Sequence, residues 1–423
     1  MTKKQRTILF IICLLLFCLI APAVIFYSQG YRIDFEHRKI TQTGGIFLRV
    51  SPKVAKVYLN GKLKDKTDPF FGSLLIENLL PQKYLLRVER ENYHFWEKEV
   101  EVKEKLVKEF KNLLLIPKNP EFKLLFKDIE DFYFFPDFRY LILKEKGEEG
   151  WSLKLFNLEK FIKSHLIGET DISKKGVTLL ELRLAPNKKR LFLKVKIENE
   201  LRYFSLSLEK IPSSLDDETE KTWNFNLDPK LDCLDFQILK NDIYCLDSKG
   251  NIWKNQTKII PTSFPLKEGV NYQLKVLKDN IFLLENQTLY HYNNLSQSFE
   301  KIKEGVKSLV LSPDQKKIAY FSDFEIWLLF LKESFGQPLR KENEKVFLTR
   351  FSEKINQLFW LSPYYLIFSG EEKIKVSEID NRDKINIVEL AEFKNPKIFW
   401  DLNKKRLYVL SQRKLYVSEE LIK

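Results

Sequence analysis

A strand–turn–strand unit that recurs along the chain constrains its fold more than any other feature. The clearest copy, Leu311 to Leu331, reads LSPDQKKIAYFSDFEIWLLFL: a Ser-Pro-Asp turn precedes two runs rich in β-branched and aromatic residues. Further copies, each with a turn followed by an apolar run, span Phe135 to Lys146, Leu184 to Val195, Leu361 to Gly370 and Trp400 to Ser411. Their recurrence predicts four-stranded antiparallel units of about 40 to 45 residues.

That period is typical of β-propeller blades. SPDQKKIAYFSDFEIWL resembles the blade signature of TolB-like and WD-repeat-like propellers, in which an S-P-D-G-K turn precedes an I-A-Y/F strand; Gln315 replaces the glycine. We expect residues 119–423 to form the propeller, with seven blades favoured and six or eight left open. The expected blade cores are Phe132 to Leu158, Leu179 to Leu208, Leu234 to Lys254, Tyr272 to Tyr292, Ser308 to Leu348, Ile355 to Leu390 and Pro396 to Val417.

The last blade core contains only three strand-like runs before the chain ends. EFKLLFKD, Glu121 to Asp128, precedes the first blade and has no partner of its own. We therefore predict that this segment supplies the missing outer strand, which would close the ring and cover both sheet edges.

A small domain is expected at residues 44–118. Apolar or alternating runs follow one another there, separated by turns, and Asn60-Gly61 is a strong hairpin signal. The economical solution for such a segment is a small antiparallel β-sandwich.

This segment resembles the PEGA domain family. It departs from the family pattern at Lys53-Val54, at an inserted Asp68, and at Gln82 and Asn92, which replace glycines. The resemblance implies a non-catalytic module of an exported protein. Tyr93 and Trp96 are expected in its core and not on a binding surface. The matching residues are Ser51, Pro52, Ala55, Val57, Tyr58, Gly61, Lys62, Thr67, Pro69, Leu80, Pro81, Tyr84, Tyr93 and Trp96.

The N-terminus contains an uncharged apolar run, residues 8–27, which is long enough to cross a bilayer as a helix. Lys3, Lys4 and Arg6 precede it and favour a cytoplasmic tail, residues 1–7, with the remainder exported. Ala21-Pro22-Ala23 keeps a cleaved signal peptide open as the alternative. Residues 28–43 are expected to be a polar spacer without regular structure.

No catalytic, cofactor-binding or metal-binding residues are predicted. The four histidines, His37, His94, His165 and His291, have no neighbours at metal-ligand spacing, and no nucleophile elbow, P-loop or dinucleotide motif occurs. Asp247 to Asn251 is interpreted as a hairpin turn and not a calcium loop. Cys233 and Cys245 are either bridged or both free thiols.

These features together predict a bacterial, membrane-anchored interaction protein of the cell envelope that is not an enzyme. Its propeller would bind an envelope protein or, through the net charge of +13, an anionic wall polymer, but no nucleic acid. Two alternatives remain: an enzyme that acts on glycans through a pair of carboxylates at the propeller mouth, and a structural component of a surface layer. A mouth lined by lysine and aromatic residues would argue against the enzyme.

Overall fold

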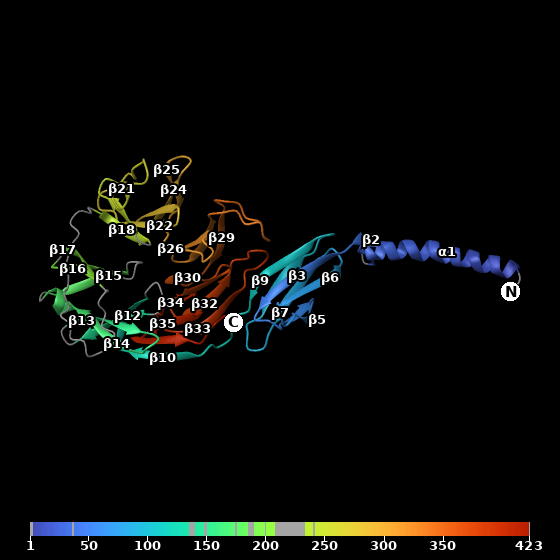
Figure 1. The fold of residues 1–423 in the computed structure, drawn as a ribbon, viewed down its shortest axis with the longest axis horizontal. Coiled ribbons are helices and arrows are strands. Elements are labelled where there is room, and N and C mark those ends of the chain that lie inside the picture. The colour runs from blue at the N-terminus through green and yellow to red at the C-terminus, as the bar shows by residue number, and fades with distance from the viewer. Residues whose placement is uncertain are drawn as a thin grey trace.

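The computed structural model describes residues 3–35, 38–134, 140–147, 150–173, 176–184, 190–198, 200–207, 233–239 and 242–422. Strands dominate these residues, and the helices among them are α1 (Lys3–Ser28) and the short α2 (Glu169–Ile172). Figure 1 shows α1 projecting from one end of a body made of strands. Outside the described residues lie an acidic polar segment, 213–222, which we expect to be a solvent loop, the hairpin turn expected near Lys240, and His37.

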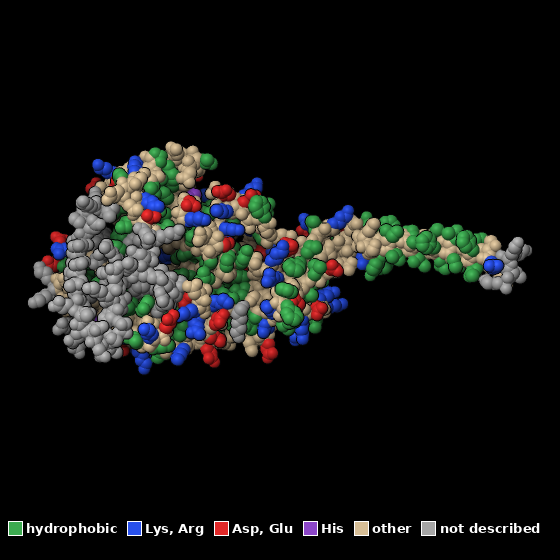
Figure 2. Space-filling view, in the orientation of Figure 1, with side chains coloured by type: hydrophobic (Ala, Val, Ile, Leu, Met, Phe, Trp, Pro, Cys, Tyr) green, Lys and Arg blue, Asp and Glu red, His purple; other side chains and the backbone are tan. Residues whose placement is uncertain are grey.

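Helix α1 includes the whole predicted apolar run, and its side chains are exposed on all sides, as the apolar surface in Figure 2 shows. It is long and apolar enough to cross a membrane, a property that a signal sequence shares. The following segment corrects the prediction of an irregular spacer, because it contains an antiparallel hairpin of β1 (Tyr31–Asp34) and β2 (Lys39–Gln42). The period-2 signal was missed because each strand has only four residues.

Two sheets form the predicted sandwich. One has the order β6-β3-β9 and the other β5-β4-β7-β8. The bounds are β3 (Gly44–Ser51), β4 (Lys56–Leu59), β5 (Lys62–Lys66), β6 (Ser73–Leu79), β7 (Lys83–Glu89), β8 (Trp96–Glu101) and β9 (Val107–Leu114). The expectation of a purely antiparallel sandwich was wrong, since β9 pairs with β3 in parallel. Because β9 runs parallel to β3, the chain leaves the sandwich beside the last residue of β3, and the propeller follows.

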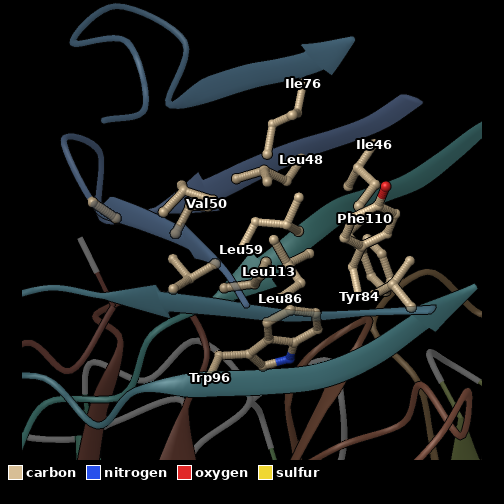
Figure 3. Close-up of a cluster of buried hydrophobic side chains, with 14 of the residues drawn as sticks. Ile46, Leu48, Val50, Leu59, Ile76, Tyr84, Leu86, Trp96, Phe110 and Leu113 are labelled. Atoms are coloured by element: carbon tan, nitrogen blue, oxygen red, sulfur yellow. The ribbon is translucent and has the colours of Figure 1, made fainter. Parts of the chain in front are cut away.

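Residues of both sheets bury one core, drawn in Figure 3, with Ile46, Leu48 and Leu86 fully buried. Asn60 and Gly61 both have positive φ, 50° and 75°, as the predicted two-residue hairpin requires. Asn92 also adopts the left-handed conformation (φ 65°), so it performs the role of the glycine it replaces. Trp96 is 4% exposed within the core and Tyr93 packs against it, which agrees with the sequence-based expectation.

The described part of the propeller forms seven sheets, six built from consecutive strands and one that joins both ends. Every predicted blade core coincides with one of these sheets. The bounds are β11 (Ile129–Phe134), β12 (Tyr140–Gly147), β13 (Gly150–Asn157) and β14 (Lys163–Gly168); β15 (Val177–Leu184), β16 (Arg190–Ile197) and β17 (Glu200–Ser207); β18 (Cys233–Leu239), β19 (Asp242–Asp247), β20 (Ile252–Lys254) and β21 (Thr257–Lys258); β22 (Tyr272–Leu277), β23 (Asn280–Glu285), β24 (Thr288–Asn293) and β25 (Ser298–Lys303); β26 (Ser308–Leu311), β27 (Lys317–Phe321), β28 (Glu325–Phe330) and β29 (Lys345–Arg350); β30 (Gln357–Ser362), β31 (Tyr365–Ser369), β32 (Lys373–Glu378) and β33 (Ile387–Glu392); and β34 (Lys397–Asp401), β35 (Arg406–Ser411) and β36 (Lys414–Ser418).

The closing strand is β10 (Phe122–Lys127), which pairs antiparallel with β36 and completes the sheet β10-β36-β35-β34. This confirms the prediction for the segment that precedes the first blade. A strand from the start of the propeller thus pairs with the last strand of the chain, so the two ends hold each other in place.

The turn of the clearest repeat unit is organised by its own polar residues. Asp314 accepts hydrogen bonds from the Ser312 hydroxyl, the Lys316 amide and the Lys317 ammonium group. Gln315 has a φ of 57°, so a glutamine here occupies the conformation for which the resembled motif uses glycine.

Candidate functional site

A hollow of about 230 Å³ lies where the first strands of several propeller sheets meet. First strands of successive sheets contact one another, β18 with β22, β26 with β30 and β30 with β34, so they form the inner wall of the ring. The hollow is lined by residues of β11, β15, β30 and β34, namely Phe132, Tyr133, Phe134, Leu182, Gln357, Phe359, Lys397, Ile398 and Phe399.

Aromatic rings form most of this wall. Phe134 and Phe399 stack with their ring centroids 4.2 Å apart, and Phe359 meets Phe399 at 5.8 Å, edge to face. The three rings come from three different sheets. The wall therefore offers an apolar surface that exists only when the ring is closed.

One charged pair borders the aromatic wall. The Lys397 ammonium group bonds Asp131 and lies 4.9 Å from the centre of the Tyr133 ring. The Tyr133 hydroxyl donates to the other carboxylate oxygen of Asp131 at 2.8 Å. Burial, and next the negative charge of Asp131, raise the pKa of Tyr133, so the phenol stays protonated and remains a donor.

The first strands are joined by side chains that bond the backbone of the next sheet. The Gln357 carbonyl oxygen accepts from the Ile398 amide at 2.6 Å, and Gln237 accepts from and donates to Val276 in the same way. Because an inner strand has no neighbour on its open side, these amides satisfy backbone groups that would otherwise be unpaired.

The described residues that line this hollow include no Asp or Glu. Asp131 stands at its border, and both of its oxygens accept hydrogen bonds, one from Lys397 and the Phe132 amide and the other from Tyr133. Glu181 on β15 is near enough to Tyr133 to contribute to its raised pKa. Asp131 and Glu181 are thus two described carboxylates near the hollow, and both oxygens of Asp131 already accept hydrogen bonds.

A second site joins the sandwich to the propeller. Lys98 of β8 is fully buried, and its ammonium group lies 2.9 Å from Glu378 Oε1. Lys98 also donates to the carbonyl oxygens of Asp380 and Arg382, at 2.6 and 2.8 Å. Its three protons therefore have three acceptors, all of them in the propeller.

Glu378 is equally well satisfied. Its Oε2 accepts from the Trp96 indole at 2.8 Å, and its Oε1 accepts from the Asn386 amide and side chain. Burial raises the pKa of Glu378, and the positive charge of Lys98 opposes that effect. Figure 3 shows Trp96 at the edge of the sandwich core, next to the strands of the propeller.

This junction was not predicted, although a signal existed. Trp96, Lys98 and Val100 lie on the same face of β8, and all three are buried. A lysine on the apolar face of a strand requires a buried acceptor. That acceptor, Glu378, is the last residue of β32, near the other end of the chain, which no local pattern reveals.

Beside the junction is a cavity of about 170 Å³ between β9 and the propeller. Most of the cations that line it are paired: Lys111 lies 2.6 Å from Glu109, Lys317 bonds Asp314, Arg340 lies 2.7 Å from Glu344, and Arg382 bonds Asp380. Lys316 also lines the cavity.

The other features singled out from the sequence have structural roles. Asp247 accepts from the amides of Lys249 and Asn251 and from the Trp253 indole, which closes the predicted hairpin turn. His165 lies 3.4 Å from Asp171, and His291 lies 3.0 Å from the Asn280 oxygen. Among the described residues, no three His, Cys, Asp or Glu side chains are grouped so that they could hold a metal ion.

Cys233 and Cys245 form a disulfide between β18 and β19, which decides between the two states left open by the sequence. Cys13 and Cys18 of α1 are free and exposed.

These elements define a protein with an apolar N-terminal helix, a small β-sandwich and a β-propeller. No family model and no curated protein matches the sequence. The PEGA and TolB-like resemblances therefore remain predictions.

Solved structures with similar folds include three proteins from different sources. The propeller domain of Cps50 (Swd1) from Myceliophteria thermophila is 10% identical, with 72% of this chain and 99% of that one covered and a TM-score of 0.46. YCF48 from Cyanidioschyzon merolae is 9% identical, with coverages of 70% and 98% and a TM-score of 0.44. An auxiliary nutrient binding protein from Bacteroides thetaiotaomicron is 11% identical, with coverages of 86% and 90% and a TM-score of 0.36. At these identities the likeness concerns the fold alone.

Proposed function

We propose that this protein is a single-pass, membrane-anchored binding protein of a bacterial envelope, with a cytoplasmic N-terminus and an exported body. The aromatic hollow of the propeller is the observation that carries the proposal. Its described lining combines stacked rings with one lysine, a combination suited to holding an apolar or planar group and not to acid–base chemistry. The partner is an envelope protein that inserts such a group, and an anionic wall polymer is the alternative.

Two further observations support the exported location. Helix α1 is exposed along its entire length, and a membrane would cover it. The disulfide between Cys233 and Cys245 is typical of proteins outside the reducing cytoplasm.

The charges on the visible face of the body are mixed in sign, which argues against a single strongly basic surface for a polymer (Figure 2).

The test is cosedimentation of the detergent-solubilised full-length protein with isolated envelopes, untreated or treated with protease, at low and high salt. We expect binding that protease abolishes and that Phe359→Ala reduces at least tenfold, roughly the effect of losing one central aromatic contact. Phe161→Ala is the matched control, because Phe161 is 71% exposed and does not line the hollow. Binding that survives protease and falls with salt would instead support the polymer.

The enzyme alternative needs a pair of carboxylates at the hollow. Asp131 and Glu181 are the described candidates, and Asp131→Asn or Glu181→Gln would abolish any glycan hydrolysis by the full-length protein. If both variants hydrolysed glycans at the rate of the unaltered protein, this pair would be excluded as the catalytic pair.

A further inference from the structure

The hairpin that follows α1 has an exposed apolar face. Ile33 and Ile40 are directly paired across β1 and β2, so their side chains share one side of the ribbon, and Phe35 follows β1 in the turn. Their side chains are 57%, 69% and 84% exposed, respectively. We call Ile33, Phe35 and Ile40 the apolar hairpin face.

The opposite face of the hairpin is polar and buried. Asp34 and Thr41 are 4% and 3% exposed, and the Thr41 hydroxyl donates to Glu104 of the sandwich. A two-stranded ribbon in water normally turns its apolar side inward and its polar side outward. This hairpin does the reverse, so its outer face is suited to a medium less polar than water.

The hairpin is fastened to the end of α1. The Gly30 amide donates to the Tyr27 carbonyl oxygen at 3.1 Å, and the Phe26 and Tyr31 rings meet edge to face at 5.4 Å. The Arg32 guanidinium group donates to Tyr27 O at 2.8 Å and lies over the Tyr27 ring. Only a few residues separate the last apolar turn of the helix from the apolar hairpin face (Figure 1).

The hairpin is equally well attached to the sandwich. Arg32 also donates to the Asn78 side chain at 2.8 Å, and the Lys105 amide donates to the Thr43 carbonyl oxygen at 3.1 Å. The helix, the hairpin and the sandwich are therefore coupled, and the position of the hairpin sets the orientation of the body.

A cation borders the apolar hairpin face. Arg38 is exposed in the turn, two residues before Ile40, whereas Lys39 is paired with Asp34 on the opposite face. Apolar side chains with flanking lysine or arginine are the chemistry that binds the headgroup region of an anionic bilayer.

We propose that the apolar hairpin face lies in the headgroup region of the bilayer that α1 spans, with Arg38 against anionic lipid headgroups. The hairpin thereby fixes how the sandwich and propeller stand on the membrane. This inference rests on the proposed anchoring by α1. Continuity with the apolar helix and the flanking Arg38 favour lipid over a protein as the partner of this face.

The test places an environment-sensitive fluorophore on single cysteines of the full-length protein in vesicles of phosphatidylcholine and phosphatidylglycerol, about two to one. Ile40→Cys, made with Cys13→Ser and Cys18→Ser, reports on the apolar hairpin face. Leu295→Cys in the same background is the control, because Leu295 is 97% exposed on the propeller. A third protein keeps native Cys13, with Cys18→Ser, and reports on α1.

We expect the label at residue 40 to shift to shorter emission wavelength and to be quenched several-fold by lipids that carry a shallow quencher, while the label at residue 295 does neither. No other protein is present, so a protein partner cannot cause this result. Quenching at Cys13 together with a fully aqueous signal at residue 40 would overturn the hairpin proposal and leave the anchor intact. Absence of quenching at Cys13 would overturn the anchor and this inference with it.

Discussion

Single residues that depart from the resembled motifs have physical roles in this protein. Asp68, an insertion relative to the PEGA pattern, accepts hydrogen bonds from the amides of Phe70, Phe71 and Ser73 and from the Ser73 hydroxyl. These bonds, led by the one from Phe71, lower the pKa of Asp68. An added residue has thus become the acceptor that organises its own loop.

We predict that this loop loosens in acid. Because the pKa of Asp68 is lower in the folded state than in the unfolded state, its contribution is complete above about pH 4 and is lost as the pH falls below that value. Measured against the intrinsic rate at each pH, amide hydrogen exchange at Phe70, Phe71 and Ser73 should accelerate as the pH falls. In Asp68→Ala it should accelerate by about tenfold at neutral pH. Unchanged exchange in that variant would show that the backbone holds the loop without the carboxylate. Asp65→Ala, at an exposed position of β5, is the control.

Gly250 allows a second prediction at this scale. Its φ is 80°, and a Cβ atom there would lie 2.0 Å from the Phe264 carbonyl oxygen. Gly269 has a similar φ, 72°, but open space around it. Gly269→Ala should cost only about 1 kcal/mol for the left-handed conformation, whereas Gly250→Ala should cost about 2 kcal/mol more because the backbone must shift. Thermal denaturation of the two variants measures the difference, and equal melting temperatures would contradict the steric argument.

At the scale of elements, the positions of the strands were far more predictable than the strands with which they pair. The turns and apolar runs located every described propeller sheet, and the closing strand β10 was inferred from a missing fourth strand. The parallel pairing of β3 with β9 was not predicted, because alternation fixes which face a strand buries and not which strand lies beside it. The sequence predicted that the propeller binds a partner, but it did not predict the residues of the hollow, because its aromatic residues come from separate sheets.

The junction between β8 and the loop after β32 illustrates the same limit. Trp96 and Glu378 are 282 positions apart, and only the folded chain brings them together. The buried pair of Lys98 and Glu378 orients the sandwich against the propeller, because all the acceptors of Lys98 belong to the propeller.

We predict that breaking this pair destabilises the protein strongly. Lys98→Met leaves the Glu378 carboxylate buried without its cation and should cost about 3–5 kcal/mol, whereas Lys98→Met with Glu378→Leu should recover much of that loss. The control is Lys83→Met, which removes the exposed pair with Glu99 and should change the stability little because solvent screens that pair. Thermal denaturation with hydrogen exchange near Asp380 gives both the size and the place of the effect. Equal costs for Lys98→Met and Lys83→Met would contradict a structural role for the buried pair.

At the scale of the whole molecule, the helix, the sandwich and the propeller are joined in series. The hairpin couples α1 to the sandwich, and the buried pair couples the sandwich to the propeller. The hollow itself depends on ring closure, because Phe134 and Phe399 come from the first and last sheets and stack only if these lie side by side. A binding site of this kind should therefore fail when the ring opens, even if every residue that lines it is unchanged.

Opening the ring at β10 tests that dependence. Successive backbone amides of a strand point to opposite sides, so one of Lys123 and Leu124 must face β36, and replacing both by proline removes that donor. We expect the double proline variant to lose about 3 kcal/mol or more and to lose envelope binding, although no residue of the hollow is altered. The double alanine variant keeps the amides and should lose neither. If the proline variant kept binding and had the same melting temperature as the alanine variant, the prediction would be wrong. The first and last sheets would then stay together without β10, and their stacked rings would be sufficient to hold the site.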